Sequence, residues 1–596
     1  MFPRFLSVLL ILIFPVFSVF PQLDSVAGAA LSSAAAEQFL EEAGRLIGED
    51  RWGEALALLE RGADFAGVSS DISYLLALAR RHEGFPLPAV LEALARAAGA
   101  GRWEKYSPVQ AYLLEAETLI WLRDYSGALR ILDRAEQGSP EIWTFSGPES
   151  GKDGGDIPPR QEDQSQAVIL RLLALKGLPD QGEFCRRLRL ALDRCPRDPR
   201  LVEILFLWAA GREAGNPGSS GRALVDLALR RLPFLLDSSP RLAYLAAPFI
   251  RDPEEAWRLV SAYRALGKAE RESLPVSIDL GLVDDGQAVE EFFAAIPEAG
   301  LEKNLIQRVW SLLRSREDRE FFRKRLLTYS GLIYSDSDGD GRSEARVRYS
   351  GGILREYSGD ADQDGIPELR VLFSSGGLPL QAEQVLGGGR GIWVEWESYP
   401  AVLRARLGEL VFDSAPGNFY FAPLRLTRLA AELMPGESAP AGELGLPYPE
   451  ADTGQARLNL RTLVSHALSV RRPSREFPGA IEHIELEQGV PRRAVEILEG
   501  KIVALTEFSL GRPRLQRLDL DLDGRMETVR HFREASVDDD AEPLDYEKIL
   551  ELVETDRDRD GLYEIGEQFL PNGIVIYSWD TDGDGIRDYV ETRNNE

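Results

Sequence analysis

Two hydrophobic patterns divide the chain. From about Ala34 to Ser330, apolar residues recur three and four positions apart, which is the spacing of one helix face, and strand-like alternation is almost absent. After Gly331 the pattern changes to short alternating runs separated by glycines, which is typical of strands joined by tight turns. The pattern therefore predicts a multidomain α + β protein, with a helical domain over residues 31–330 followed by antiparallel β regions.

Similar helical segments recur in the first part of the chain. Matching small residues stand at Ala55, Ala89 and Ala128; the first step is 34 residues and the second is somewhat longer. Such a period is typical of stacked helix pairs, in which small residues let two helices approach closely. The segments resemble degenerate tetratricopeptide repeats (TPR), and the resemblance implies a concave surface that binds a protein or peptide partner. The residues themselves leave a generic helical solenoid open.

Stretches rich in glycine, proline and polar residues interrupt these patterns. Residues 146–166 form one such stretch, which predicts a flexible insert within the helical domain. The predicted order after that domain is a β region at 331–425, a linker at 426–475 and a β region at 476–596. Apolar spacing in and beside the linker predicts two short helices, at 424–433 and 458–470.

The β regions repeat one unit, an acidic loop followed by a strand, a glycine turn and a second strand. Two pairs of loops start 24 residues apart, at Asp336 and Asp360 and again at Asp556 and Asp580. In four of the five loops an aromatic residue stands 13 residues after the first aspartate, namely Tyr349, Phe373, Phe532 and Phe569. The phase predicts an antiparallel meander with its aromatic side chains on one face and its loops along one edge.

The five loops share the pattern Asp-x-Asp-x-Asp-Gly-x-x-(Glu/Asp). Carboxylates at alternate positions converge if the backbone wraps around a common centre, and the glycine allows that turn. Without a cation these carboxylates would repel one another, so the pattern predicts a cage for a hard cation, most naturally Ca²⁺. The candidate metal ligands are Asp336, Asp338, Asp340, Arg342 and Glu344; Asp360, Asp362, Asp364, Ile366 and Glu368; Asp519, Asp521, Asp523, Arg525 and Glu527; Asp556, Asp558, Asp560, Leu562 and Glu564; and Asp580, Asp582, Asp584, Ile586 and Asp588.

The loops resemble the EF-hand-like calcium loops of integrin α-subunit propellers and FG-GAP-type repeats. A true EF-hand has Glu at the twelfth position, which only Glu567 and Glu591 satisfy, whereas the ninth position is acidic in all five loops. The resemblance implies that the three aspartates, the seventh-position carbonyl and the ninth-position carboxylate bind Ca²⁺. The competing interpretation is a set of solvated turn residues, because Asp and Gly also favour turns without a metal.

The N-terminus has the layout of a secretory signal peptide. Arg4 precedes an apolar run from Phe5 to Phe20, and a small-residue Ala-x-Ala site follows. We therefore predict a signal peptide over residues 1–30, with an uncleaved anchor as the alternative, and a periplasmic, cell-surface or secreted location. No later segment is apolar enough to span a membrane. The formal net charge of −28 argues against nucleic acid as a partner.

The residue types used in catalysis form no recognisable constellation. The four histidines (His82, His466, His483 and His531) lack zinc-ligand spacing, and the glycine run at 387–391 lacks the Lys-Ser/Thr of a phosphate loop. Cys185 and Cys195 stand at the two ends of one predicted helix, too far apart for a disulfide. The sequence thus predicts no catalytic or organic-cofactor site.

Together these features predict an exported, non-enzymatic scaffold. Its helical solenoid would bind a protein partner, and Ca²⁺ would stabilise its β repeats. The first alternative is a calcium-dependent hydrolase of an envelope or extracellular polymer, which perturbed carboxylates in a pocket away from the loops would favour. The second is a surface adhesin, suggested by the integrin-like loops alone.

Overall fold

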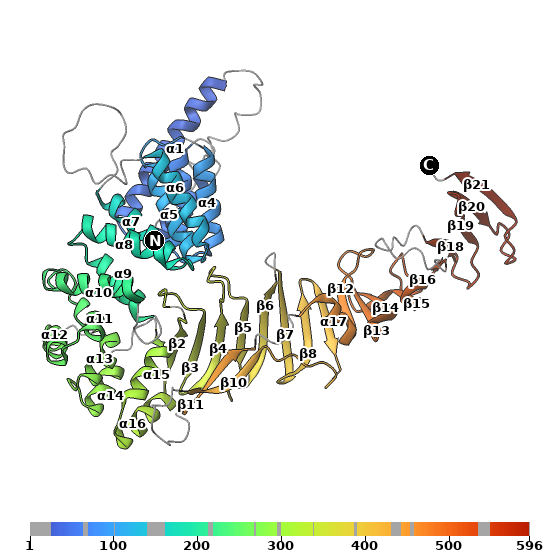
Figure 1. Ribbon diagram of the computed structural model, residues 1–596. Coiled ribbons are helices and arrows are strands. Elements are labelled where there is room, and N and C mark those ends of the chain that lie inside the picture. The colour runs from blue at the N-terminus through green and yellow to red at the C-terminus, as the bar shows by residue number, and fades with distance from the viewer. Residues whose placement is uncertain are drawn as a thin grey trace, which may run out of the picture. The chain divides into compact units, whose positions relative to one another are not determined.

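The computed structural model divides into two compact units (Figure 1). The first comprises Met1–Ala295 with Asp338–Arg342 and Asp362–Ile366, and the second comprises Ile296–Ser337, Ser343–Ala361 and Pro367–Glu596. The residues that the structure describes are 25–62, 69–100, 102–139, 161–211, 218–267, 270–294, 300–337, 339–386, 390–415, 417–430, 443–452, 458–533 and 549–594. Most of the predicted signal peptide lies outside these ranges and stays a prediction.

The first unit is a succession of short helices, as the 3.6-residue pattern predicts. They are α1 (Ser25–Gly48), α2 (Trp52–Arg61), α3 (Ser70–His82), α4 (Leu87–Ala100), α5 (Pro108–Trp121), α6 (Tyr125–Gly138), α7 (Gln161–Lys176), α8 (Gln181–Arg194), α9 (Pro199–Ala210), α10 (Gly218–Arg231), α11 (Leu242–Ala246), α12 (Pro253–Ala265), α13 (Leu274–Asp279) and α14 (Asp285–Ala294), with 3-10 turns η4 (Leu232–Phe234), η5 (Ala247–Phe249) and η6 (Arg271–Ser273). No helix in the described ranges is both long and apolar enough to cross a membrane.

Aspartate caps and proline starts define where several of these helices begin. The side chains of Asp124, Asp180, Asp198 and Asp252 each accept a backbone N–H of the helix that follows. Asp71 is fully buried, and its carboxylate accepts the N–H groups of three consecutive residues, 104 to 106, at 2.9–3.1 Å. This carboxylate anchors the chain between α4 and α5 to helix α3, because leaving so many buried donors unpaired would be costly.

The small residues chosen to align the repeats have unequal burial. Ala55 and Ala128 are fully buried, as expected for helix contacts, whereas Ala89 is only partly buried and its neighbours Val90 and Ala93 take the inner positions of α4. The predicted insert at 146–166 is wrong at its end, because α7 already begins at Gln161; the insert's earlier residues lie outside the described ranges.

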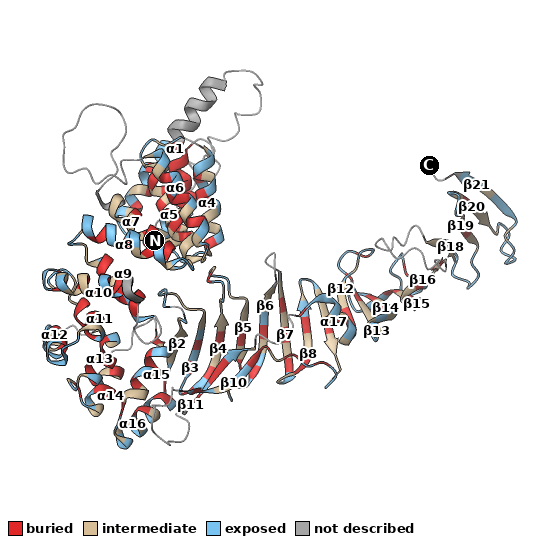
Figure 2. Cartoon of the chain, viewed as in Figure 1, coloured by how far each residue is buried: buried red, intermediate tan, exposed pale blue. Residues whose placement is uncertain are grey.

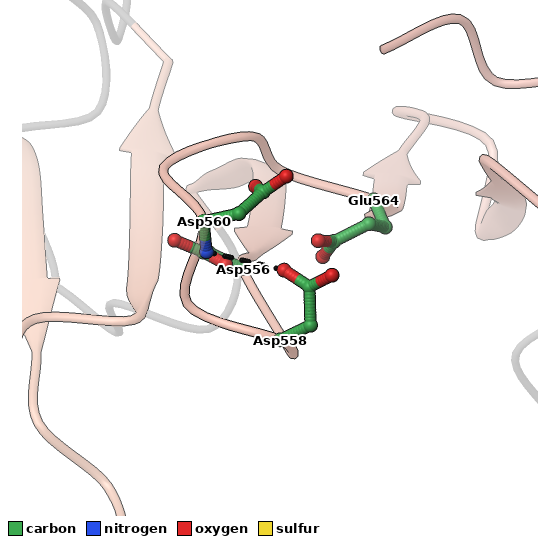
Figure 3. A group of neighbouring side chains, drawn as sticks. All are labelled: Asp556, Asp558, Asp560 and Glu564. Carbon is green, nitrogen blue, oxygen red and sulfur yellow. Dashed lines mark hydrogen bonds between the residues drawn. The ribbon is translucent and has the colours of Figure 1, made fainter. Parts of the chain in front are cut away.

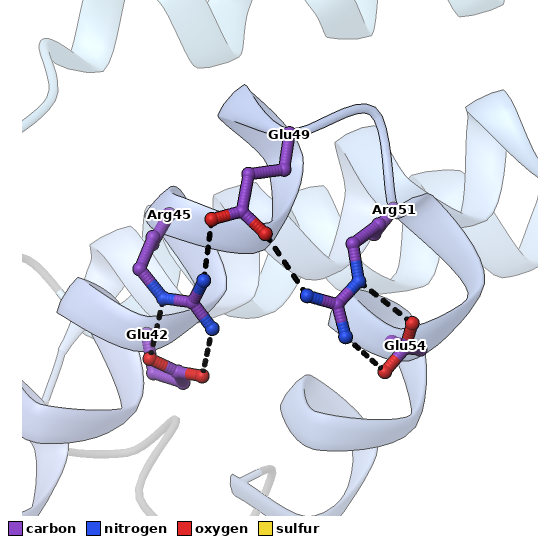
Figure 4. Close-up of polar contacts among 5 residues, drawn as sticks. All are labelled: Glu42, Arg45, Glu49, Arg51 and Glu54. Atoms are coloured by element: carbon purple, nitrogen blue, oxygen red, sulfur yellow. Dashed lines mark hydrogen bonds and ion pairs between the residues drawn. The ribbon is translucent and has the colours of Figure 1, made fainter.

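An exposed chain of alternating charges spans the turn from α1 to α2. Figure 4 shows Arg45 between Glu42 and Glu49, and Arg51 between Glu49 and Glu54. Hydrogen bonds from the two arginines hold the pKa of each of these three glutamates below its usual value. The groups are exposed, so water screens the chain, and it contributes little to stability.

The second unit is dominated by strands. Its helices are α15 (Lys303–Leu312), α16 (Arg316–Leu327) and α17 (Leu460–His466). Its strands are β1 (Leu301–Glu302), β2 (Gly331–Ser335), β3 (Ala345–Ser350), β4 (Ile353–Gly359), β5 (Leu369–Phe373), β6 (Pro379–Leu386), β7 (Arg390–Ser398), β8 (Ala401–Leu407), β9 (Leu410–Ser414), β10 (Leu424–Ala430), β11 (Glu443–Ala451), β12 (Ala467–Pro473), β13 (Ile481–Glu487), β14 (Val490–Leu498), β15 (Lys501–Ser509), β16 (Arg512–Leu518), β17 (Thr528–Phe532), β18 (Leu550–Thr555), β19 (Ile565–Phe569), β20 (Ile574–Trp579) and β21 (Tyr589–Asn594).

Most of the described strands form one 19-stranded sheet in meander order. Strands β2 to β9 and β12 to β21 pair antiparallel with their neighbours in the chain, β9 pairs with β12, and β1 lies parallel to β2. The predicted antiparallel meander is thus confirmed. The two predicted β regions belong to the same sheet, because residues 467–473 continue the ladder between them.

The predicted helix at 424–433 is wrong. Residues Leu424–Ala430 form strand β10, which pairs antiparallel with β11 as a separate hairpin. The predicted helix at 458–470 is shorter than expected: α17 ends at His466, and the chain then enters strand β12. Tertiary pairing overrides local helical spacing at both places, because the strand partners lie outside the window from which a helix is predicted.

The hairpin packs against the sheet near β3 and β4. The hydroxyl of Tyr349 in β3 donates to the carbonyl of Pro447 in β11 at 2.8 Å, and Leu444, Leu446 and Tyr448 of β11 are buried. Each strand from β2 to β8 carries buried residues, whereas strands β18 to β21 are almost entirely exposed or intermediate (Figure 2). Of the four phased aromatics, Tyr349, Phe373 and Phe532 are buried and Phe569 is partly buried.

Candidate metal-binding loops

All five acidic loops lie at the same end of the strands. We number them in chain order: loop 1 joins β2 to β3, loop 2 joins β4 to β5, loop 3 joins β16 to β17, loop 4 joins β18 to β19, and loop 5 joins β20 to β21. In an antiparallel meander, successive turns lie at alternate ends of the strands. Strand β9 pairs antiparallel with β12, so the even-numbered strands of the meander all run in one direction. Each acidic loop follows an even-numbered strand, which places all five loops at the same end.

The glycine at the sixth position of each loop adopts a left-handed conformation. Its φ angle lies between 85° and 99° in all five loops, at Gly341, Gly365, Gly524, Gly561 and Gly585. Side chains with a Cβ rarely adopt such angles, so glycine is the residue that permits this turn. The turn predicted from the glycine is therefore present in every loop.

Backbone N–H groups bind the loop carboxylates in a repeated arrangement. The ninth-position carboxylate accepts the N–H of the second residue at 2.6–3.0 Å in all five loops. The fifth-position aspartate accepts the N–H of the seventh residue at 2.6–2.9 Å. These bonds fold each loop inward around its own acidic side chains.

The carboxylates of loop 4 converge on one point. Oxygen atoms of Asp556, Asp558, Asp560 and Glu564 lie within 4.8 Å of one another, and Figure 3 shows these side chains around a common centre. Three carboxylates converge in the same way in loops 2, 3 and 5, at Asp360, Asp362 and Glu368; Asp519, Asp521 and Glu527; and Asp580, Asp582 and Asp584. In loop 1, Asp338 lies outside the described residues.

Three predicted ligands stand apart from the groups of their own loops, and each makes another contact. Asp364 accepts the N–H of Ile366, Asp523 forms an ion pair with Arg559, and Asp588 accepts the hydroxyl and N–H of Thr581. No structural contact distinguishes the five seventh-position carbonyls, at Arg342, Ile366, Arg525, Leu562 and Ile586, as ligands. They stay predictions from the resemblance.

The donor set fits a hard cation. It consists of carboxylate oxygens, the ligands that Ca²⁺ prefers, and the buried oxygens Glu527 Oε2 and Glu564 Oε1 have no hydrogen-bond partner. Asp519 is fully buried, although its oxygens do accept the N–H groups of Asp523 and Gly524. Buried carboxylate oxygens without a partner are costly, and a cation at the loop centre would satisfy them.

The neighbouring carboxylates of loop 4 disfavour one another's charge. The N–H of Asp560 lowers the pKa of Asp558, but the adjoining Glu564 carboxylate, desolvation and the charge of Asp560 together raise it above its usual value. In loop 5, desolvation of Asp580 is outweighed by N–H donors, first that of Gly585, so its pKa falls below the usual value. Backbone N–H groups therefore compensate the charge of Asp580 in loop 5 more fully than that of Asp558 in loop 4.

Arg559 of loop 4 reaches into loop 3, which the sequence motif did not predict. Its guanidinium forms ion pairs with Asp521 and, at 2.8 Å, with Asp523. Arg587 of loop 5 similarly donates to the carbonyl of Tyr563 in loop 4 at 3.2–3.3 Å. The sequence signal was the presence of arginine at non-ligand positions of neighbouring loops, but only strand pairing brings these positions together.

A second group of carboxylates lies away from the loops. Glu482 and Glu496 face each other on β13 and β14, and each is more than nine-tenths buried. Arg472 forms an ion pair with Glu482, and the Ser474 hydroxyl donates to Glu496. Burial raises the pKa of Glu496, opposed by the Ser474 hydrogen bond and reinforced by Glu482. A hydrolase would need such carboxylates in a pocket, and the burial of Glu482 and Glu496 keeps this pair from an external substrate.

Three of the four histidines have structural partners. His82 stacks on Trp52, His466 stacks on Phe419, and His531 lies 3.0 Å from a Glu554 oxygen. The convergent metal-ligating groups found in the described ranges contain no histidine or cysteine, and both cysteines are free thiols. The absence of a disulfide between Cys185 and Cys195 agrees with the prediction.

Comparisons with known proteins give distant likenesses. No protein-family model matches the chain. An uncharacterized protein of Treponema pallidum (strain Nichols) is 23% identical over 371 residues, which are 52% of this chain and 43% of that protein. The chain therefore matches less than half the length of this relative.

Several solved TPR proteins are similar to part of the chain. MamA 41-end from Desulfovibrio magneticus RS-1 is 14% identical and covers 34% of this chain and 96% of its own, with a TM-score of 0.26. YrrB, described as a TPR protein with an unusual peptide-binding site, is 13% identical and covers 34% of this chain and 94% of its own, also with a TM-score of 0.26. Scores this low carry no argument on binding, and the helical description rests on the chain's own helices.

Proposed function

We propose that this protein is an exported, non-enzymatic scaffold with two working parts. The helical unit binds a protein or peptide partner, and Ca²⁺ in the acidic loops stabilises the β sheet. The observation that carries the calcium proposal is the convergence of four loop-4 carboxylates within 4.8 Å. Such a group repels itself unless a cation or protons compensate its charge.

The ligands of each ion are the loop's own oxygen atoms. In loop 4, Asp556, Asp558, Asp560 and Glu564 supply carboxylates, and the carbonyl of Leu562 completes the set that the motif implies. The first and ninth positions lie beside the two strands that the loop joins. An ion held by both positions therefore links neighbouring strands at the edge of the sheet. Extracellular calcium modules typically bind at about 10⁻⁴–10⁻³ M, which suits structural loading rather than signalling.

Calcium titration of the full chain tests the ligand set. The double variant Asp556→Asn with Asp560→Asn removes two charges from loop 4 and leaves the other four loops intact. We expect calorimetry to lose one binding site and hydrogen exchange of β18 and β19 to stop responding to Ca²⁺. Equal binding stoichiometry in the variant and the parent would show that loop 4 holds no ion.

The partner-binding half needs a separate experiment. A photo-crosslinking amino acid placed at exposed Leu207 or Leu266 of the helical unit, in the cell that makes the protein, should give a discrete adduct. The same amino acid at Leu510, an exposed turn residue of the sheet, is the control. Adducts that form equally at all three positions, or at none, would contradict partner binding by the helices.

The hydrolase alternative has less support. Its expected signature was perturbed carboxylates in a pocket away from the loops. Burial raises the pKa of Glu496, which faces Glu482 across β13 and β14, but both side chains are almost fully buried. General acid–base catalysis needs the groups within reach of the substrate. The adhesin alternative rests on loop resemblance alone, and the loop geometry serves a scaffold equally well.

A further inference from the structure

We propose that a groove between helices α12 and α13 holds a basic side chain, lysine or arginine, of the protein partner. The groove has a volume of about 510 Å³ and is lined by Pro253, Glu254, Trp257, Arg258, Asp279 and Leu280. The proposal rests on the proposed function, because it specifies the chemistry of one contact that the helical unit makes with its partner.

Trp257 is the unusual residue of this groove. It is 46% exposed, and no other tryptophan among the described residues belongs to the exposed class. Tryptophan is large and apolar, and leaving so much of it in water forgoes the gain from burial. Its ring has no stacking or cation contact with another described residue. An indole face left open in a groove is the best aromatic surface for a cation.

The charges around the ring favour a cation over an anion. Arg258, the positive group in the groove, pairs with Glu254 at 3.0 Å, so these two charges offset each other. Asp279 is exposed and has no ion pair or hydrogen bond with any other described residue. The groove therefore keeps one uncompensated negative charge, from Asp279, together with the exposed side chain of Trp257.

A lysine or arginine side chain matches both features of the groove. Its methylene stem would contact Leu280 and Pro253, and its cationic head would lie over Trp257 and near Asp279. An acidic side chain would meet Asp279 and an indole face that repels anions, with the groove's arginine already paired. The net charge of −28 further favours encounter with a basic partner.

Fluorine NMR of the full chain tests the proposal. The protein is labelled with 5-fluorotryptophan, kept in saturating Ca²⁺ so that the acidic loops do not attract the probe, and titrated with hexalysine. The Trp257→Phe variant identifies the resonance of Trp257. We expect that resonance to shift saturably with hexalysine, and we expect hexaglutamate at equal ionic strength to leave it unmoved.

Two variants separate the groove from general attraction to an acidic protein. Asp279→Asn should weaken hexalysine binding roughly threefold or more, the size of an exposed cation–π or charge contact. Phe234→Ala removes another exposed aromatic of the same unit that does not line the groove, and it should bind as the parent does. Both positions are exposed, so neither variant should unfold the helices.

Three outcomes overturn the groove proposal: a Trp257 resonance that hexalysine does not move, a shift shared equally by all resonances, or unchanged affinity in Asp279→Asn. A shift with hexaglutamate instead would assign the groove to an acidic segment. If the groove fails while crosslinks at Leu207 and Leu266 still capture a partner, the scaffold function stands and its contact lies elsewhere on the helices.

Discussion

The two halves of the 19-stranded sheet differ in how many hydrophobic residues they bury. We call strands β2 to β9 the covered half and strands β13 to β21 the open half. In the covered half, hairpin β10–β11 packs on the sheet, and large side chains such as Tyr349, Tyr357 and Trp396 are buried. In the open half the buried hydrophobic residues are fewer, namely Ala494, Val503, Ala504, Leu518, Val529, Phe532 and Val575.

The character of the buried positions differs as well. The open half buries the polar residues Glu482, Glu496, Thr506, Gln516, Asp519 and Thr528. The buried residues of the covered strands are apolar or aromatic, and burial raises the pKa of Tyr357 to about 12. Three of the five acidic loops serve the open half, and two serve the covered half. The open half has only a small buried cluster, formed by Phe477, Ala480, Val503, Ala504 and Leu518 among the described residues. We therefore expect loop ions to matter most there, since hydrophobic burial is the main source of stability of a sheet.

The largest effect should come from the covered half. Tyr448 of β11 is 2% exposed and lies under the Lys303 ammonium group, 4.4 Å from its ring centre. Tyr448→Ala should lower the free energy of unfolding by about 3–5 kcal/mol, because it opens a cavity in the hairpin that packs on these strands. Urea denaturation measures the loss, and hydrogen exchange should localise it to β2 to β6.

Two controls make the Tyr448 result decisive. Tyr448→Phe removes a buried hydroxyl that has no hydrogen-bond partner, so it should be neutral or slightly stabilising. Tyr420→Ala truncates an exposed tyrosine and should change little. If Tyr448→Ala were as mild as Tyr420→Ala, the hairpin would not be what stabilises the covered half.

Calcium removal should affect the halves unequally. A chelator should speed hydrogen exchange in β16 to β21 more than in β2 to β5, because fewer hydrophobic residues are buried in the open half. With calcium at ten times Kd, each occupied site contributes about 1.4 kcal/mol to stability. The three sites of the open half should therefore contribute more than the two sites of the covered half. Magnesium at equal concentration is the control, since it demands tighter octahedral geometry. Equal acceleration in both halves would show that the loop ions stabilise the two halves alike.

The buried carboxylate of the open half should make stability depend on pH. Because the pKa of Glu496 is raised above its usual 4.5 in the folded state, its contribution is full at low pH and is lost as pH rises through the folded pKa. Glu496→Gln should therefore flatten the decline in stability above about pH 4.5 and be the more stable form at neutral pH. Unfolding curves across pH measure this, and Glu485→Gln, an exposed position on the neighbouring strand β13, is the control.

The smallest effect concerns the link between loops 3 and 4. Arg559 occupies Asp521 and Asp523, two predicted ligands of loop 3, so an ion there must displace it. Arg559→Ala should tighten calcium binding at loop 3 by severalfold, read as the calcium midpoint for protection of β16 and β17. Arg593→Ala, which breaks an exposed pair with Glu591, should leave that midpoint unchanged. Weaker calcium binding in Arg559→Ala would show that Arg559 supports the loop 3 site and does not compete with the ion.

Prediction from the sequence succeeded where a feature is encoded within a few neighbouring residues. The helical period, the strand–turn–strand units and the left-handed glycine of every acidic loop follow from local spacing and backbone sterics. Prediction failed at Leu424–Ala430, whose helical spacing is overridden by a partner strand some 20 residues away. It also missed Arg559, whose carboxylate partners are 36 and 38 residues earlier in the chain.

Local patterns were enough to predict the two classes of structure, the five acidic loops and the residue types within them. Three features emerge only from the folded chain: both β regions share one sheet, all the loops lie at one end of its strands, and a hairpin packs on strands β3 and β4. The physical reason is that periodicity shows which face of an element is apolar, whereas the partner that covers that face is chosen by packing and pairing across the whole chain.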